Sequence, residues 1–383
     1  MRTIKVFDTT LRDGEQGIGF CMTSHQKIRI LKTLDTLGLD VIELGFPAAS
    51  PEDKEWVRLA LAMKPKTKCC VFTRLNTADI NILLEAIKGA QVQVQLLAVG
   101  SEIHLTKKRN ITRSESLLEL HTAIQQLHTS GQDDICVIFE DSTRGSMAFI
   151  EEAVTLCLNQ KVTGITIADT TGCATPEKIY AITKHLREIV PYACDLGIHC
   201  HNDLGLATAN TLSAIRAGAN IIQTTLGGIG ERTGNCALEE IFAALFFCQE
   251  EYKAKINIDP KRTYNACHFV FQEMGGHVAA NKPIIGEHVF STSAGLHQDG
   301  LIKDPEIYTH VQPEVFGREH QLIFNRLSGR KLIQATLSNY PVSARLLTEF
   351  TRTLTAKQRD FTVAEILAEF QAFQVHKREK NDS

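Results

Sequence analysis

The chain has 383 residues, of which 43% are hydrophobic, and its formal net charge is −3. This length exceeds one small domain, the apolar content suffices for a large core, and the charge excludes nucleic-acid coating as the main role. No run of about 18 apolar residues occurs, so we expect neither a membrane span nor a membrane partner. Eleven cysteines, without a signal peptide or a CxxC pair, predict reduced thiols in the cytoplasm.

Short apolar runs alternate with helical patterns, about 30 residues apart, through the first 255 residues. The predicted strands are Ile4–Phe7, Val41–Leu44, Lys68–Thr73, Val92–Val99, Ile135–Phe139, Gly164–Ala168, Leu196–His201 and Ile221–Thr225. The predicted helices are Ser24–Leu37, Pro51–Met63, Thr77–Ala90, Arg113–Ser130, Ala148–Asn159, Pro176–Val190, Thr208–Ala217 and Ala237–Tyr252. Nearly continuous apolar strands are typical of parallel sheets covered on both faces. Eight such units predict an α/β fold, a closed (β/α)8 TIM barrel, with a doubly wound open sheet as the alternative.

The pattern changes after residue 255. Residues 275–300 are rich in Gly, Ser, Thr and His, which predicts a linker or an active-site loop. Thr362–Phe373 has the pattern of an amphipathic helix with Thr362 as its N-cap. We therefore expect a catalytic barrel at 1–255, a linker with a histidine-bearing active-site loop at 256–300, and a small mixed C-terminal subdomain with helices at 301–383.

Two histidines, His199 and His201, stand two residues apart on a predicted strand and so point to the same face. An isolated pair of this kind is more often structural than metal-binding. However, Asp13 follows the first predicted strand and Asn235 follows the eighth, and these two strands are neighbours in a closed barrel. One carboxylate, two imidazoles and an amide oxygen at one rim suit Zn²⁺, Mn²⁺, Mg²⁺ or Co²⁺.

Charged residues follow other predicted strands. Arg12, beside Asp13, could hold a carboxylate or a developing oxyanion, or it could form an ordinary rim salt bridge. Glu140 and Asp141 end the fifth strand, with Arg144 close behind. This carboxylate pair could perform acid–base chemistry, or it could simply form an ion pair with Arg144.

Two further polar positions allow both a functional and a structural interpretation. Thr170 follows the sixth predicted strand and offers a hydroxyl for a substrate carboxylate, although threonine is also an ordinary helix cap. His297 lies in a glycine-rich segment, where a histidine can act as a mobile general acid or base. An isolated histidine in such a segment is more often a surface residue.

Four motifs occur in order: DTTLRDGEQ at 8–16, HCHNDLGLATAN at 199–210, GIGERTGN at 228–235 and SAGLHQDG at 293–300. Together they resemble the acyl-CoA-dependent condensing synthases of the 2-isopropylmalate synthase and homocitrate synthase family. This family belongs to a metal-dependent TIM-barrel superfamily that also contains acyl-CoA lyases. The first three motifs resemble the whole superfamily, and SAGLHQDG narrows the resemblance to the condensing synthases.

The resemblance implies a Claisen condensation of acetyl-CoA with an α-keto acid, assisted by a divalent metal, that gives an alkylmalate and CoA. It implies that the metal ligands are Asp13, His199, His201 and Asn235.

The resemblance also implies roles for other residues. Arg12 would stabilise the oxygen that gains charge, and Thr170 would bind the keto-acid carboxylate. His297 and Glu140, with Tyr308 nearby, would serve the proton transfers. An intertwined homodimer is implied, in which the His297 loop reaches the barrel of the partner subunit. Little chain follows position 345, so the short form without the leucine-binding regulatory domain is expected.

The identity of the keto acid rests on finer similarities. Residues 101–104 (SEIH) resemble the SPIH stretch of isopropylmalate synthases, whereas Ala168-Asp-Thr170 resembles the ADT of homocitrate synthases. Ile138 stands where a serine or glycine is expected in the keto-acid pocket. His104 is one candidate, with Arg74, Lys107 and Lys108, for binding a distal carboxylate, and Arg144 is common to both groups. We favour 2-isopropylmalate synthase, which acts on 2-oxoisovalerate in leucine biosynthesis; the alternatives are homocitrate synthase, which acts on 2-oxoglutarate, and an acyl-CoA lyase.

Overall fold

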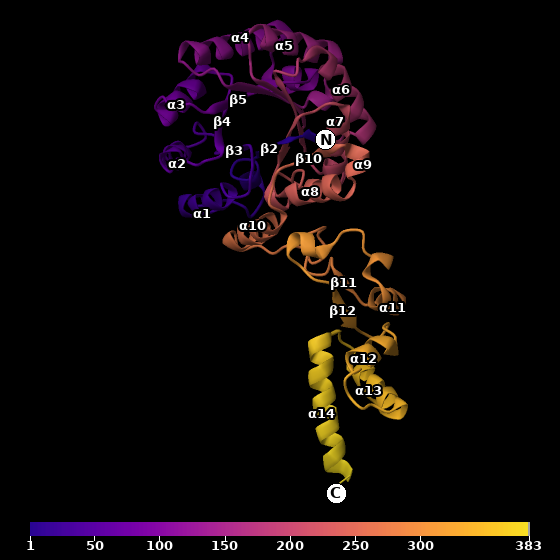
Figure 1. The fold of residues 1–383 in the computed structure, drawn as a ribbon. Coiled ribbons are helices and arrows are strands. Elements are labelled where there is room, and N and C mark those ends of the chain that lie inside the picture. Colours follow the sequence, from indigo (N-terminus) through magenta and orange to yellow (C-terminus); the bar gives the residue numbers. More distant parts are fainter. Residues whose placement is uncertain (382–383) are drawn as a thin grey trace. The chain divides into compact units, whose positions relative to one another are not determined.

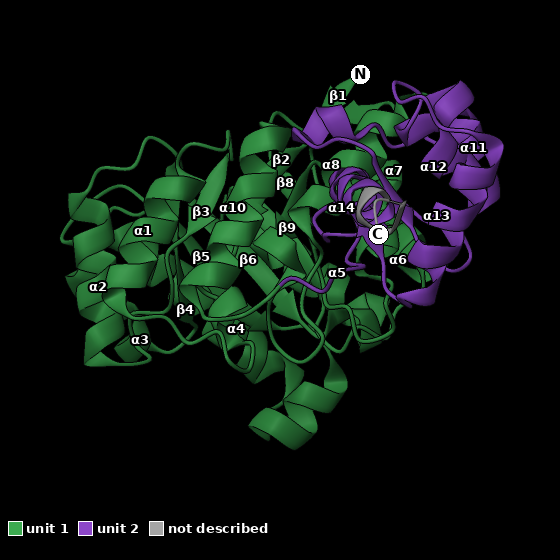
Figure 2. Ribbon diagram, turned by 90° about the horizontal axis from the view of Figure 1, so that it is seen from below, with its two compact units in different colours: residues 1–277 green, residues 278–383 purple. Residues whose placement is uncertain are grey.

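A computed structural model describes residues 1–381, and the chain divides into two compact units, the second of which begins at Val278. Figure 2 shows the two units in different colours.

The first unit is a closed barrel of parallel strands surrounded by helices (Figure 1). The strands follow one another around the barrel in chain order: β2 (Lys5–Asp8), β3 (Val41–Glu43), β4 (Lys68–Arg74), β5 (Gln93–Val99), β6 (Ile135–Glu140), β7 (Gly164–Asp169), β8 (Asp195–Cys200) and β9 (Ile221–Thr224). Strand β9 pairs with β2 and closes the barrel. This confirms the predicted TIM barrel over the open sheet, and it places the carboxyl ends of all eight strands at one rim.

The helices of the first unit lie close to their predicted positions: α1 (Ser24–Leu34), α2 (Pro51–Ala62), α3 (Thr77–Ile87), α4 (Arg113–Thr129), α5 (Met147–Asn159), α6 (Pro176–Ile189), α7 (Ala207–Ala217) and α8 (Leu238–Phe247). Several begin at side-chain N-caps, such as Ser50 before α2 and Thr112 before α4. The single helix predicted over Ala237–Tyr252 is wrong, because Cys248 has non-helical dihedral angles and separates α8 from α9 (Gln249–Tyr252).

Smaller elements complete the first unit. A short parallel pair joins β1 (Arg2–Thr3) to β10 (Ala254–Lys255), and α10 (Pro260–Glu273) follows. Residues 256–277, predicted to be part of a linker, thus contain a helix of the first unit. Four short helical turns follow barrel strands: η1 (Gly14–Gln16), η2 (His104–Arg109), η3 (Ser142–Arg144) and η4 (Leu226–Gly228).

The second unit packs helices on a three-stranded sheet. The sheet order is β11 (Ser291–Thr292), β12 (Gln321–Phe324) and β13 (Phe361–Thr362). The other elements are α11 (Gly295–Lys303), η5 (Pro305–Ile307), η6 (Pro313–Phe316), α12 (Arg330–Thr336), α13 (Ala344–Ala356) and α14 (Val363–Asn381). Phe324, Phe350 and Phe370 form part of its core. Thr362 caps α14 as predicted, since its hydroxyl accepts from the Glu365 backbone N–H.

The loop predicted around His297 is instead helix α11. Its glycines disfavour a helix in isolation, but tertiary hydrogen bonds override this propensity. The buried amide of Gln298 donates to the carbonyl oxygens of Thr292 and Ile323, which anchors α11 on the sheet. The predicted division of the chain into three parts, with boundaries at residues 255 and 300, stays a prediction. Within residues 1–381, no helix is long and apolar enough to cross a membrane.

Candidate active site

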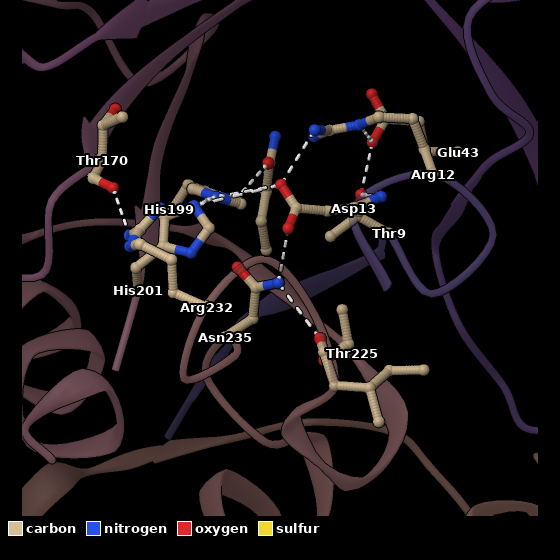
Figure 3. Close-up of polar contacts among 12 residues, drawn as sticks. Thr9, Arg12, Asp13, Glu43, Thr170, His199, His201, Thr225, Arg232 and Asn235 are labelled. Carbon is tan, nitrogen blue, oxygen red and sulfur yellow. Dashed lines mark hydrogen bonds and ion pairs between the residues drawn. The ribbon is translucent and has the colours of Figure 1, made fainter. Parts of the chain in front are cut away.

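Three predicted metal ligands, Asp13, His199 and His201, meet at the carboxyl-terminal rim of the barrel (Figure 3). Their candidate ligand atoms lie within 4.8 Å of one another, and all three residues are buried. The Nε2 atoms of the histidines are 3.2 Å apart, and the His199 Nε2 lies 3.6 Å from Oδ2 of Asp13. The convergence follows from barrel closure, because Asp13 follows β2 and the histidines come from β8 and its end.

The fourth predicted ligand, Asn235, lies against this cluster. Its Nδ2 donates to Oδ1 of Asp13 at 2.8 Å and to the carbonyl oxygen of Ile229 at 3.1 Å. Its amide oxygen is buried and has no hydrogen-bond partner among the described residues. An unsatisfied buried acceptor costs about 1–3 kcal/mol, and a bound cation would satisfy it. The donor set therefore fits a divalent metal ion.

The electrostatics of the cluster favour the protonation states that a metal requires. Burial alone would raise the pKa of Asp13, but the charge of Arg12 and the hydrogen bond from Asn235 bring it well below its usual range. Burial lowers the pKa of His199 to about 3, against the opposing effect of Asp13, and burial also lowers the pKa of His201. A carboxylate and two neutral imidazoles are the forms that bind divalent ions at neutral pH.

Arg12 is fixed between two carboxylates. Its Nε donates to Oε2 of Glu43 and its Nη1 to Oδ2 of Asp13, each at 2.8 Å. The guanidinium also lies 4.9 Å from the centre of the Phe72 ring. The salt bridge that the sequence allowed is thus present, and it fixes the positively charged guanidinium of Arg12 beside the candidate metal site. Sequence reasoning missed Glu43 because it lies at the end of an otherwise apolar strand.

Glu140 is paired with basic residues of the turn η2. Its carboxylate lies 3.1 Å from Nδ1 of His104 and 2.7 Å from Nζ of Lys108. Arg144 instead donates from Nε to Oδ1 of Asp141 at 2.7 Å. The ion pair expected between this carboxylate pair and Arg144 therefore involves Asp141, and it leaves Glu140 to His104 and Lys108.

Thr170 is held by its backbone and its hydroxyl. Its Oγ1 accepts from the backbone N–H of Asp141 at 2.8 Å, which leaves the hydroxyl proton available for donation. Its carbonyl oxygen accepts from Nη2 of Arg232, which also binds Asp203. Arg232 thereby connects the loops after β7, β8 and β9. Arg232 was not identified as a site residue from the sequence, and its place inside the GIGERTGN motif was the signal that could have identified it.

His297 and Tyr308 lie together in the second unit. Their rings stack with centroids 4.3 Å apart. Both line a cavity of about 380 Å³ that also includes His310 and His320. The predicted proximity of Tyr308 to His297 is therefore present in the fold of the second unit alone.

Comparisons with known proteins identify the family. The HMGL-like family matches residues 3–270, and the homocitrate synthase post-HMGL domain-like family matches residues 284–362. The 2-isopropylmalate synthase of Lactococcus lactis subsp. cremoris is 36% identical over 97% of this chain and 74% of its own length. A Methanopyrus kandleri protein, provisionally named (R)-citramalate synthase, is 34% identical over 88% of this chain. The chain spans 65% of the length of that relative.

Solved structures support the fold. The HMG-CoA lyase of Bacillus subtilis superposes with a TM-score of 0.63 at 19% identity, over 73% of this chain and 96% of that one. The HMG-CoA lyase of Brucella melitensis gives a TM-score of 0.62 at 19% identity, over 72% of this chain and all of that one. The chain therefore belongs to the HMGL-like family, among the 2-isopropylmalate synthase and homocitrate synthase type of enzymes, which couple a TIM barrel to a post-HMGL domain.

Proposed function

We propose that this chain is an alkylmalate-type synthase that condenses acetyl-CoA with an α-keto acid and releases CoA, and that the keto acid is 2-oxoisovalerate, as for a 2-isopropylmalate synthase. The observation that carries this proposal is the buried cluster of Asp13, His199 and His201 at the barrel rim. The similarity to named 2-isopropylmalate synthases supports the reaction class.

The binding residues fit an α-keto acid. Asp13, His199, His201 and Asn235 would hold a divalent ion (Mn²⁺, Mg²⁺, Zn²⁺ or Co²⁺), which supplies a Lewis acid for the keto group. The hydroxyl of Thr170 has a proton to donate to the substrate carboxylate. Arg12, held rigidly by Glu43 and Asp13, stabilises the keto oxygen as it gains negative charge.

The proton transfers need a base and an acid. The acetyl methyl group loses a proton to a base, its carbon forms a bond to the keto carbon, and the keto oxygen accepts a proton. Water then hydrolyses the thioester and releases CoA. We assign these transfers to Glu140, which the neighbouring Lys108 and His104 bind, and to His297 with its stacked partner Tyr308.

The side chains near Arg12 favour an apolar keto acid. Phe72, against which Arg12 packs, forms an apolar cluster with Ile138, Ala168, Phe46 and Leu97. Three of the candidate partners for a distal carboxylate are engaged by acidic residues: Lys108 and His104 by Glu140, and Arg74 by Asp79. Both features favour 2-oxoisovalerate over 2-oxoglutarate, the substrate of the homocitrate synthase alternative.

A second candidate substrate is pyruvate, which would make the enzyme a citramalate synthase. Ile138 is 3% exposed and occupies space in the apolar cluster, which suits a smaller keto acid. The relative from Methanopyrus kandleri carries that name. We expect the volume of the side chain at position 138 to decide whether 2-oxoisovalerate or pyruvate is the better substrate.

The test is CoA release from acetyl-CoA, measured with free-thiol reagent, Mn²⁺ and separate keto acids. Release with 2-oxoisovalerate supports the proposal, and release with pyruvate or 2-oxoglutarate alone replaces it with one of the alternatives. Ile138→Ser should raise kcat/KM for 2-oxoisovalerate relative to pyruvate. The matched control is Val137→Ala, on the same strand but with its side chain on the opposite face. No release with any keto acid, together with cleavage of a 3-hydroxyacyl-CoA, would favour the lyase.

We also propose that a homodimer forms the working site, with His297 acting in the barrel of the partner. Arg12→Ala and His297→Ala would then inactivate different parts of one shared site. A one-to-one mixture that exchanges subunits should recover about a quarter of wild-type activity, since hybrid dimers contain one intact site. Each variant alone is the control, and a mixture as inactive as its components would place both residues in one subunit's site.

A further inference from the structure

A chain of buried polar side chains crosses the interior of the barrel. Nε2 of Gln95 on β5 donates to Oε1 of Glu43 on β3 at 2.6 Å. Nε2 of Gln223 on β9 donates to Oε1 of Gln95 at 2.5 Å, and Oε1 of Gln223 lies 3.0 Å from Nδ1 of His199. All four residues are at most 3% exposed, so water does not compete for these bonds. These hydrogen bonds thus link Glu43, through Gln95 and Gln223, to His199, a candidate metal ligand. We call this hydrogen-bonded series of four side chains the relay.

The direction of this hydrogen-bond chain is set at the Glu43 end. An ionised carboxylate only accepts hydrogen bonds. The other oxygen of Glu43 already accepts from the hydroxyl of Thr9 and from Nε of Arg12. Gln95 must therefore present its NH₂ group to Glu43, and its carbonyl oxygen then faces Gln223.

The same logic continues to the histidine. Gln223 must present its NH₂ group to the Gln95 oxygen, and so its own oxygen faces Nδ1 of His199. A flip of either amide would place two oxygens or two NH₂ groups opposite each other inside the barrel, which is costly in a buried site. Nδ1 of His199 must then carry the proton, and in a neutral imidazole this leaves Nε2 as a bare acceptor.

We propose that Gln95 and Gln223 are positioning residues. Because Glu43 can only accept hydrogen bonds, it fixes the orientation of both amides, and these hold His199 in its Nδ1–H tautomer. The Nε2 lone pair of His199 is thereby kept toward Asp13 and His201, from which it is 3.6 and 3.2 Å away. Its use as a metal ligand rests on the proposed function, whereas the tautomer itself does not. His201 has no comparable device, because its Nδ1 lacks a partner among the described residues.

The tautomer can be measured in metal-free protein. Two-bond ¹H–¹⁵N correlations of histidine-labelled protein distinguish Nδ1–H from Nε2–H, and His199→Gln assigns the signal. We expect His199 to be neutral and protonated at Nδ1. An Nε2–H signal in the wild type would overturn the relay without any variant.

Gln95→Leu provides the sharper test, because Gln95 does not touch His199. Its loss frees the Gln223 amide to flip, so we expect a mixture of His199 tautomers, as for Gln223→Leu. In both variants we expect the affinity for Mn²⁺ alone, measured by calorimetry, to fall by about 10–100-fold. Gln95→Met repeats the test if the leucine variant does not fold.

The matched control is Gln93→Leu. Gln93 lies on the same strand, two residues before Gln95, is 5% exposed and donates to Asp134 outside the relay. This variant should leave both the tautomer and the Mn²⁺ affinity unchanged. A wild-type tautomer that persists in Gln95→Leu would refute the relay. Absence of Mn²⁺ binding in the wild type would instead refute the metal site of the proposed function, with the tautomer result unaffected.

Discussion

Gly230 is the position at which a single methyl group should damage the candidate metal site. It has φ +153° in the loop after β9. A Cβ atom at this position would overlap Nδ2 of Asn235 and lie 3.0 Å from Oδ1 of Asp13. The Asn235 backbone is held by a hydrogen bond to Gly228 and by its bridge to His201. In Gly230→Ala the Asn235 side chain must therefore rotate away.

The expected cost follows from the contacts that are lost. Rotation removes the Asn235 hydrogen bonds to Asp13 and Ile229, at about 1 kcal/mol each. An alanine at this φ adds about 1 kcal/mol or more of backbone strain. A total of roughly 3 kcal/mol corresponds to a fall in Tm of about 6–12 °C for a domain of this size. Because Asn235 no longer faces the site, we expect Mn²⁺ affinity to fall by about 10–100-fold.

Calorimetry with Mn²⁺ and thermal unfolding measure the two effects separately. Gly205→Ala is the control, since Gly205 also has positive φ, at +72°, but a Cβ atom added there would meet no other atom within 4 Å. It should lose about 1 kcal/mol of stability and keep its Mn²⁺ affinity. If Gly230→Ala binds Mn²⁺ as tightly as Gly205→Ala does, the contact between Asn235 and Asp13 does not support the metal site.

Other perturbations test the charges of the site. Burial raises the pKa of Asp8 to about 7, so ionisation opposes folding as the pH rises from about 4 to 7, and Asp8→Asn should gain stability over wild type through this range in urea titrations and level off above it. Arg12→Lys keeps the charge but cannot bridge Glu43 and Asp13 together, so kcat should fall by about 100-fold or more while unfolding remains cooperative. Mn²⁺ at 100 times its Kd should stabilise the wild type by about 2.7 kcal/mol against thermal unfolding and leave Asp13→Ala unchanged.

The barrel was predictable because each strand and helix carries its own local signal. Ser50 followed by Pro51 marks the start of α2, and the run Gly164–Asp169 is buried throughout, as its composition indicates. Closure then brings residues that are distant in sequence together. Asp13 follows β2 and His199 lies on β8, and these are the two strands that pair with β9, so the geometry of the cluster follows from the topology.

Features that depend on three-dimensional hydrogen bonding were not predictable. The helix around His297 depends on the Gln298 amide, whose acceptors include a carbonyl 25 residues later in the chain. The pairing of Glu140 with Lys108 depends on the π-helical turn η2. Gln95 and Gln223 lie in strands that are buried on both faces. The sequence therefore did not show which side chains point into the barrel and which point toward the surrounding helices.

The interior of the barrel also explains why the candidate site suits a divalent cation. Towards the amino-terminal side, Phe7 and Ile221 belong to an apolar layer, whereas the layer nearer the rim contains Glu43. Asp13 and Glu43 contribute two formal negative charges, and Arg12 contributes one positive charge. Because the histidines are neutral, the buried cluster carries one uncompensated negative charge, which is costly away from water. A divalent ion would change the net charge of the cluster from −1 to +1, which an anionic ligand such as a carboxylate would balance, and it would also satisfy the amide oxygen of Asn235. The charge and the hydrogen-bond requirements are therefore both met by a divalent ion together with an anion.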